Sequence, residues 1–222
     1  MKKSGAANVD VGGYSRRRGR PRAFDRDAAL AKAVRLFWMR GFEATSIADL
    51  TAGLGIGAPS LYAAFESKEA LYAEALQRYV DDNEAYVWAG FQAAQTAREA
   101  VRSLLSDSAA ALTGCVADLP RGCMVTLSQV GSKGTEALGE LVRAARAQTL
   151  ARLMRRIENA VAAGEISPAA DRHALARFIQ TTQAGMSILA RDGASGDELQ
   201  AVADMAMEAW DARSSATRPL SA

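Results

Sequence analysis

Apolar residues recur along most of this chain at spacings of three and four, the pattern of helices that bury one face. The first such stripe consists of Leu30, Ala33, Val34, Phe37 and Trp38. Asp25 precedes it as a predicted N-cap, and Gly41 follows it as a residue type that is common at helix C-termini. No window alternates apolar and polar residues as a half-buried strand would. The pattern therefore predicts an all-α chain of about nine helices.

Two short helices are predicted next, separated by a glycine-containing turn. Thr45 is the expected N-cap of the first, and Pro59 stands in the first turn of the second, where its missing N–H costs nothing. The apolar positions of the pair are Ile47, Leu50, Leu54, Leu61 and Phe65. Both apolar faces would rest on the preceding helix. This layout predicts a helix-turn-helix between Thr45 and Phe65.

The rest of the chain predicts longer helices. Ser67 is the expected cap of a helix whose apolar stripe continues to Phe91. Glycine and proline positions separate the remaining predicted helices, which span 97–115, 122–131, 135–163, 168–191 and 196–212.

Composition supports a folded chain with a sizeable core, because 49% of the residues are apolar and 23% are charged. No uninterrupted apolar run suggests a secretory signal or a membrane span, so we expect a cytoplasmic protein with no membrane partner. Two cysteines, Cys115 and Cys123, are too few for a disulfide framework, which fits a reducing compartment.

Charge is distributed unevenly. Residues 1–22 carry seven Lys and Arg but one acidic residue, a net +6, so the other 200 residues carry −4 of the total of +2. A basic arm without apolar residues to bury is expected to be disordered when free and to meet a polyanion such as nucleic acid. The arginines expected to contact DNA are Arg16, Arg17, Arg18, Arg20 and Arg22. The run 18–22 resembles a minor-groove hook; the alternative is a solubilising tail.

A set of motifs between residues 41 and 76 carries a family resemblance. They are Gly41–Phe42, Thr45–Ser46, Gly55–Ile56, Leu61–Tyr62, Phe65 and Ser67–Lys68–Glu69. In this order and spacing they resemble the DNA-binding segment of the TetR family (AcrR-like) of bacterial repressors. The resemblance implies a homodimer with an N-terminal three-helix reading head, a double-stranded and palindromic DNA operator, and a C-terminal helical domain that binds a small-molecule inducer.

The same resemblance implies DNA-contacting positions in the head. It puts Ala58, Pro59, Ser60 and Tyr62 on the recognition helix, and Thr45, Ser46 and Lys68 at positions that usually contact phosphates. Hydroxyls, a lysine and helix N-termini suit phosphate independently of the family. Ala63 and Ala64 stand where many relatives carry polar or aromatic residues, which leaves fewer side chains to read base edges.

The resemblance also implies a domain division and a dimer interface. The expected parts are a basic arm (1–22), a helix-turn-helix domain (23–70), an effector-binding and dimerisation domain (71–213) and a tail (214–222). The last two helices would form a four-helix bundle with a second copy, although their stripes could also be ordinary core. The expected interface residues are Phe178, Thr182, Gly185, Met186, Leu189, Val202, Ala206 and Trp210.

Ligand-contacting residues are predicted from side-chain type. Aromatic and methionine side chains suit a cavity between long helices, but they suit core packing equally well. The candidate set is Trp88, Phe91, Met124, Leu127, Met154 and Phe178.

Other chemistry finds less support in the sequence. Cys123 follows Arg121 at an expected helix start, where a lowered thiol pKa would allow redox sensing; a buried inert thiol is the alternative. Cys115, Cys123, Met124 and His173 lack metal-ligand spacing, so neither a metal nor a cofactor is expected. A single histidine and the absence of a catalytic constellation argue against an enzyme, which a turnover screen would detect. General DNA packaging without an inducer is the third possibility, recognisable by equal binding to any DNA.

Overall fold

The computed structural model describes residues 24–114, 119–131 and 134–215. They form α1 (Arg26–Arg40), α2 (Ile47–Leu54), α3 (Ala58–Phe65), α4 (Lys68–Asn83), a π-helical turn η1 (Glu84–Trp88), α5 (Ala89–Ala93), α6 (Ala97–Leu112), α7 (Met124–Leu127), α8 (Glu136–Ala162), α9 (Arg172–Asp192) and α10 (Gly196–Ser214). No strand occurs within these ranges, so the all-α prediction is confirmed. In the same ranges, no helix is both long and apolar enough to cross a membrane.

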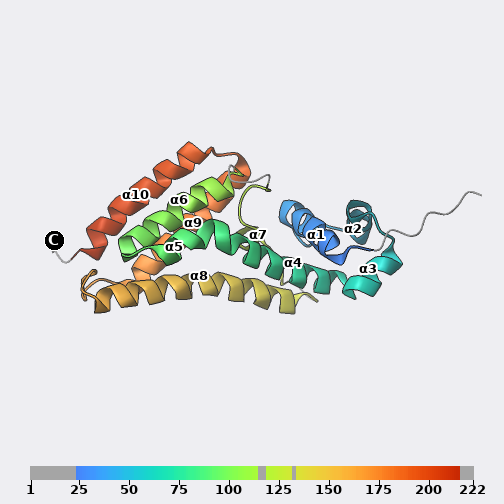
Figure 1. The fold of residues 1–222 in the computed structure, drawn as a ribbon, viewed down its shortest axis with the longest axis horizontal. Coiled ribbons are helices and arrows are strands. Elements are labelled where there is room, and N and C mark those ends of the chain that lie inside the picture. The colour runs from blue at the N-terminus through green and yellow to red at the C-terminus, as the bar shows by residue number, and fades with distance from the viewer. Residues whose placement is uncertain (1–23, 115–118, 132–133, 216–222) are drawn as a thin grey trace, which may run out of the picture.

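The molecule is elongated, with α1, α2 and α3 at one end and α6, α9 and α10 at the other (Figure 1). Helix α4 runs from the first group into the second, and α8 lies along α4 and the second group (Figure 1). We call α1–α3 the head and the helices from α5 onward the body. The predicted boundary between residues 70 and 71 falls inside α4, which packs on α1 as well as meeting α8.

The head is held together by an aromatic cluster. The Tyr72 ring of α4 lies edge-on to both Phe37 and Phe42, with centroid distances of 5.1 Å to each. Beside them, Trp38 and Tyr79 pack edge to face at 4.7 Å. Such geometry adds to the burial of apolar area and fixes the angle between α1 and α4. The position of the head therefore depends on α4.

Capping residues fix the ends of α1 and α4. Asp25 caps α1 as predicted, accepting a hydrogen bond from the Ala28 N–H at 3.0 Å, and Gly41 ends that helix with φ of +78°. Ser67 caps α4 through a 3.0 Å bond from the Ala70 N–H. The predicted long helix that reaches Phe91 is interrupted by η1, so it comprises α4, η1 and α5.

One predicted helix is wrong. The apolar spacing predicts a helix over 122–131, but only Met124–Leu127 is helical. The guanidinium of Arg146, from α8, donates to the carbonyl oxygens of Val125, Thr126 and Ser128 at 2.7–3.2 Å. These carbonyls would accept bonds from later residues if the helix continued. A long-range contact therefore replaces the helix.

Candidate nucleic-acid interface and internal cavity

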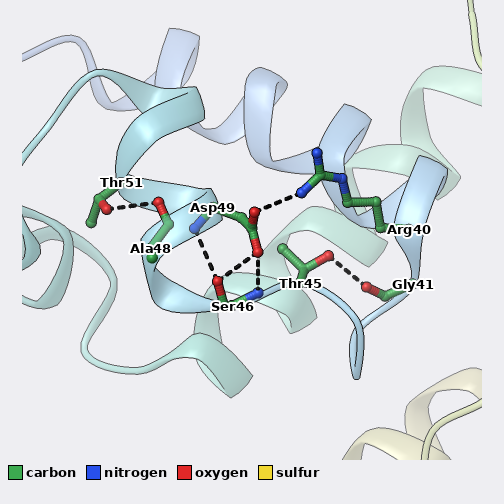
Figure 2. Close-up of polar contacts among 7 residues, drawn as sticks. All are labelled: Arg40, Gly41, Thr45, Ser46, Ala48, Asp49 and Thr51. Atoms are coloured by element: carbon green, nitrogen blue, oxygen red, sulfur yellow. Dashed lines mark hydrogen bonds and ion pairs between the residues drawn. The ribbon is translucent and has the colours of Figure 1, made fainter.

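The start of α2 is fixed by a reciprocal cap. The Ser46 hydroxyl accepts a bond from the Asp49 N–H at 3.1 Å, and the Asp49 carboxylate accepts one from the Ser46 N–H at 2.9 Å (Figure 2). Arg40, the last residue of α1, pairs with the same carboxylate at 2.7 Å (Figure 2). The bond from the Ser46 hydroxyl is the main reason that the Asp49 pKa is lowered to about 2. The Asp49 carboxylate thus bonds to residues on both sides of the turn between α1 and α2.

The prediction that Thr45 caps α2 is wrong by one residue. The Thr45 side chain is fully buried, and its hydroxyl donates to the Gly41 carbonyl oxygen at 2.7 Å (Figure 2). A buried hydroxyl with an internal partner has no route to a phosphate. Ser46, whose side chain is exposed, is the N-cap of α2, and its phosphate contact stays a prediction.

Helix α3 presents a clear division between a buried and an open face. Leu61 and Phe65 are buried against the head, with 0% and 1% of their surface exposed. Of the four predicted recognition residues, Pro59, Ser60 and Tyr62 are exposed and Ala58 is half-buried. Gly55, with φ of +72°, makes the sharp turn that separates α3 from α2. Contact of this exposed face with DNA stays a prediction.

Lys68 begins α4 close to this face. Its ammonium lies 4.1 Å from the centroid of the Phe42 ring, so an aromatic face positions the charge while the side chain stays half-buried. The predicted phosphate contact of Lys68 stays a prediction. The five arm arginines, Arg16, Arg17, Arg18, Arg20 and Arg22, lie outside the described residues.

A cavity of about 760 Å³ lies between α4 and the body, and Trp38 of α1 also lines it. Its walls come from α4 and η1, α6, α8, α9 and the segment 122–130. Trp88 is the one member of the predicted ligand set that lines it. Phe91 and Met124 are buried in the two hydrophobic cores, Met154 packs on the body core, Leu127 is half-buried and Phe178 is exposed. The lining side chains that the sequence analysis missed include eight polar ones on α8 and α9.

Residues 122–128, which we call the connecting segment, join the cavity wall to the head. The Trp38 indole N–H, from α1, donates to the Gly122 carbonyl oxygen at 2.9 Å. At the other end, the hydroxyls of Ser128 and Tyr72, from α4, are 2.6 Å apart. The Cys123 N–H donates to the Ser187 hydroxyl of α9 at 2.8 Å. Three elements from both parts of the molecule therefore hold one short segment.

Cys123 is half-buried on the cavity wall beside Tyr79. Burial, with Cys123 as the next cause, raises the pKa of the Tyr79 hydroxyl well above its ordinary value. Cys123 precedes a helix of four residues rather than the longer one expected. Redox sensing by Cys123 stays a prediction, and Cys115 lies outside the described residues.

An open apolar stripe runs along α9 and α10. Among the predicted interface residues, Phe178, Leu189 and Val202 are exposed, Thr182 is half-buried, and space is open around Gly185. Met186, Ala206 and Trp210 are core residues of the protomer, with at most 4% of their surface exposed, which corrects that part of the set. Ile188 and Met205, 51% and 71% exposed, lie on the same two helices and were missed.

Comparisons with known proteins match both parts of the chain. Residues 29–75 match the model described as "Bacterial regulatory proteins, tetR family", and residues 97–206 match "Tetracyclin repressor-like, C-terminal domain". In Escherichia coli K12, the HTH-type transcriptional repressor ComR is 39% identical over 87% of this chain and 92% of its own length. From the same organism, the HTH-type transcriptional repressor BdcR is 33% identical over 88% and 93%.

A solved structure extends the likeness to a DNA complex. A cysteine mutant of the TetR family transcriptional regulator CifR, complexed with 26-bp double-strand operator DNA, is 39% identical with a TM-score of 0.80. The match covers 86% of this chain and 100% of that one. The likeness therefore includes both the head and the body.

Proposed function

The chain belongs to the TetR family of bacterial regulatory proteins, and from this membership we propose that it represses transcription until a small molecule releases it from its operator. It is a sequence-specific DNA-binding transcriptional regulator, and we expect it to have no enzymatic activity. The main support for this proposal is the exposed face of α3. The opposite face is buried through Leu61 and Phe65, and the Ser46–Asp49 cap fixes the start of α2 beside it. We assign the protein to the cytoplasm, where its operator would be.

In this proposal α3 enters the major groove. Tyr62 and Ser60 offer hydroxyl groups to base edges, and Pro59 offers an apolar contact. Ser46 and Lys68 stand at the starts of α2 and α4, where helix dipoles and backbone N–H groups favour phosphates. The arm, with its five arginines, adds contacts in the neighbouring minor groove.

The working form is a homodimer on a palindromic operator. Two copies of α3 must meet successive major grooves, about 34 Å apart. The exposed stripe of α9 and α10 supports this arrangement, since contiguous apolar surface usually marks an interface. Gly185 has open space above it and would allow a helix of the second copy to approach closely.

We propose that ligand binding releases the protein from its operator through the connecting segment. Gly122, Cys123 and Ser128 line the cavity, while Trp38 and Tyr72 tie this segment to α1 and α4. If a ligand fits the cavity when this segment is in one position but not in another, its binding favours the first position. The head, which is bonded to the segment, would then shift with it. A coupling of about 1–3 kcal/mol suffices for regulation.

A second link joins the head to α9. The guanidinium of Arg191 donates to the carbonyl oxygens of Trp38 and Met39 at 2.8 and 3.1 Å, at the C-terminal end of α1. A change in α9 at the proposed dimer interface would therefore move α1 directly.

The domain division that we propose remains 23–70 for DNA binding and 71–213 for effector binding and dimerisation.

Selection from a random DNA library tests the proposed function. The full-length protein is expected to enrich a palindrome whose half-sites are separated by about one helical turn. A pool that stays random after several rounds, while the protein retains salt-sensitive DNA binding, would favour general packaging over regulation.

A further inference from the structure

Helix α3 has no side-chain cap of its own at either end. Its N-terminal end is at Gly57, and its last turn holds no basic residue to face the negative end of the helix dipole. Glu66 ends it with φ of +65°, where a glycine would be the common residue. A helix of only eight residues owes its stability to tertiary contacts, so the position of α3 depends on its neighbours.

Arg26, at the start of α1, supplies such contacts at the C-terminal end of α3. Its Nε donates to the Ala64 carbonyl oxygen at 3.2 Å, although the two residues are 38 positions apart. Its guanidinium carbon lies 4.5 Å from the centroid of the Phe65 ring. The last carbonyls of a helix find no donor within it, and a cation beside them is favoured by the helix dipole. One side chain of α1 therefore caps α3 and packs on its last residue.

A third contact of Arg26 reaches α4. Its Nη2 donates to the Glu74 carboxylate at 2.7 Å. Both side chains are partly exposed, so this pair adds little to stability, but it fixes the direction of the guanidinium. Phe24, the first described residue, lies edge-on to the same Phe65 ring, with the centroids 6.4 Å apart. The end of α3 is thus held between the start of the described chain and α4.

This geometry suits arginine in particular. A planar guanidinium donates in fixed directions from Nε and Nη2 while its face lies on a ring, whereas a lysine ammonium is a point charge without that plane. We propose that Arg26 is a positioning residue that holds the recognition helix at its angle, and so contributes to sequence selectivity without contacting DNA. This assignment rests on the proposed function, because it takes α3 as the recognition helix.

Selectivity and salt dependence together separate positioning from a phosphate contact. The probes are the palindrome selected from the random library and a scrambled duplex of equal length. Arg26→Gln is expected to lower the preference for the palindrome about tenfold, the value of one base contact held in poor geometry. The slope of log affinity against log salt is expected to stay as in the parent protein. A phosphate contact would instead reduce that slope by ~0.9 and weaken both duplexes equally.

Two lysine variants separate the shape of the side chain from its charge. Arg26→Lys keeps the charge but loses the fork, so we expect it to lose as much preference as Arg26→Gln. Arg98→Lys is the matched control, since Arg98 makes an exposed two-point pair with Asp211 in the body, at 2.7 Å from both Nε and Nη2. It is expected to keep the preference of the parent protein.

Hydrogen exchange measures the hold on α3 without DNA. Exchange at residues 61–66 is expected to become faster in both Arg26 variants, with circular dichroism showing that the fold is retained. Unchanged exchange there would overturn the assignment, as would a parent-like preference in either Arg26 variant, a reduced salt slope in Arg26→Gln, or an equal loss in Arg98→Lys. A parent protein without preference for any DNA sequence would contradict the proposed function itself, and exchange would still measure whether Arg26 holds α3.

Discussion

At the scale of single residues, the start of α2 depends on the pair Ser46 and Asp49. Each side chain satisfies a backbone N–H of the other, and Arg40 adds an ion pair from α1. Because the folded-state pKa of Asp49 is about 2 and its ordinary value is 3.8, the cap stabilises the fold fully above pH 3.8. That contribution is lost as the pH falls from about 3.8 to about 2.

Replacing Ser46 tests this pair. Ser46→Ala removes the hydroxyl that contributes most to the low pKa, so the Asp49 pKa is expected to rise from about 2 toward 3.8. Carbon-detected NMR titration of the carboxylates measures it. Thr51→Ala is the control, since the Thr51 hydroxyl donates to the Ala48 carbonyl oxygen on the same helix. An Asp49 pKa near 2 in Ser46→Ala would show that the cap is not its cause.

Glu66 has an unusual backbone conformation. It is the one residue other than glycine with positive φ in the described part of the chain, at 65°, and it ends α3. Such a conformation costs about 1–2 kcal/mol for a residue with a Cβ. Glu66→Gly is expected to raise the free energy of unfolding by about 1 kcal/mol in urea denaturation. Glu66→Ala keeps the Cβ but removes the charge, so a similar gain in that variant would assign the effect to charge instead.

At the scale of elements, the stripe of apolar residues predicts most helices well. The predicted spans 135–163 and 196–212 correspond to α8 at Glu136–Ala162 and α10 at Gly196–Ser214. Burying one face against a core dictates this spacing, so it is visible in the sequence. The helix predicted over 122–131 fails because its carbonyls bond to Arg146, a contact that local spacing does not encode.

The predicted site residues also divide into those that local sequence reveals and those that it does not. The head residues could be predicted because a family motif carries them, apart from Thr45, whose burial depends on the Gly41 carbonyl. Five of the six predicted ligand-contacting residues do not line the cavity, because an apolar side chain suits a core and a cavity equally. The polar residues that line the cavity become recognisable only when α8 and α9 lie together.

The connecting segment should lose order when Trp38 can no longer bond to it. Trp38→Phe removes the indole donor and leaves the buried Gly122 carbonyl oxygen without it, at an expected cost of about 1–3 kcal/mol in unfolding free energy. Hydrogen exchange at residues 122–128 is expected to become faster. Trp88→Phe, at a half-buried cavity residue, is the control. Unchanged stability and exchange in Trp38→Phe would show that this hydrogen bond does not hold the connecting segment in place.

For the whole molecule, the proposed function requires two copies. The exposed stripe of α9 and α10 contains Ile188 and Met205, which the protomer leaves open. Met205→Glu would bring a charge into the proposed interface, so light scattering is expected to show a monomer and operator affinity to fall by ~100-fold as the two half-sites are no longer linked.

Leu141→Glu serves as the control for this prediction. Leu141 is 45% exposed on α8, away from the stripe, and its substitution is expected to leave the dimer intact. A Met205→Glu protein that remains dimeric, or a Leu141→Glu protein that dissociates, would place the interface elsewhere.

A regulator must recognise a particular DNA sequence, whereas a packaging protein need not. Fluorescence anisotropy at fixed salt, comparing the promoter next to its own gene with a scrambled duplex of equal length, measures this most directly. We expect the promoter duplex to bind more tightly than the scrambled one by a factor of ~10³ or more. Equal, salt-sensitive binding to both duplexes, and to every fragment of a genome-wide search, would contradict it.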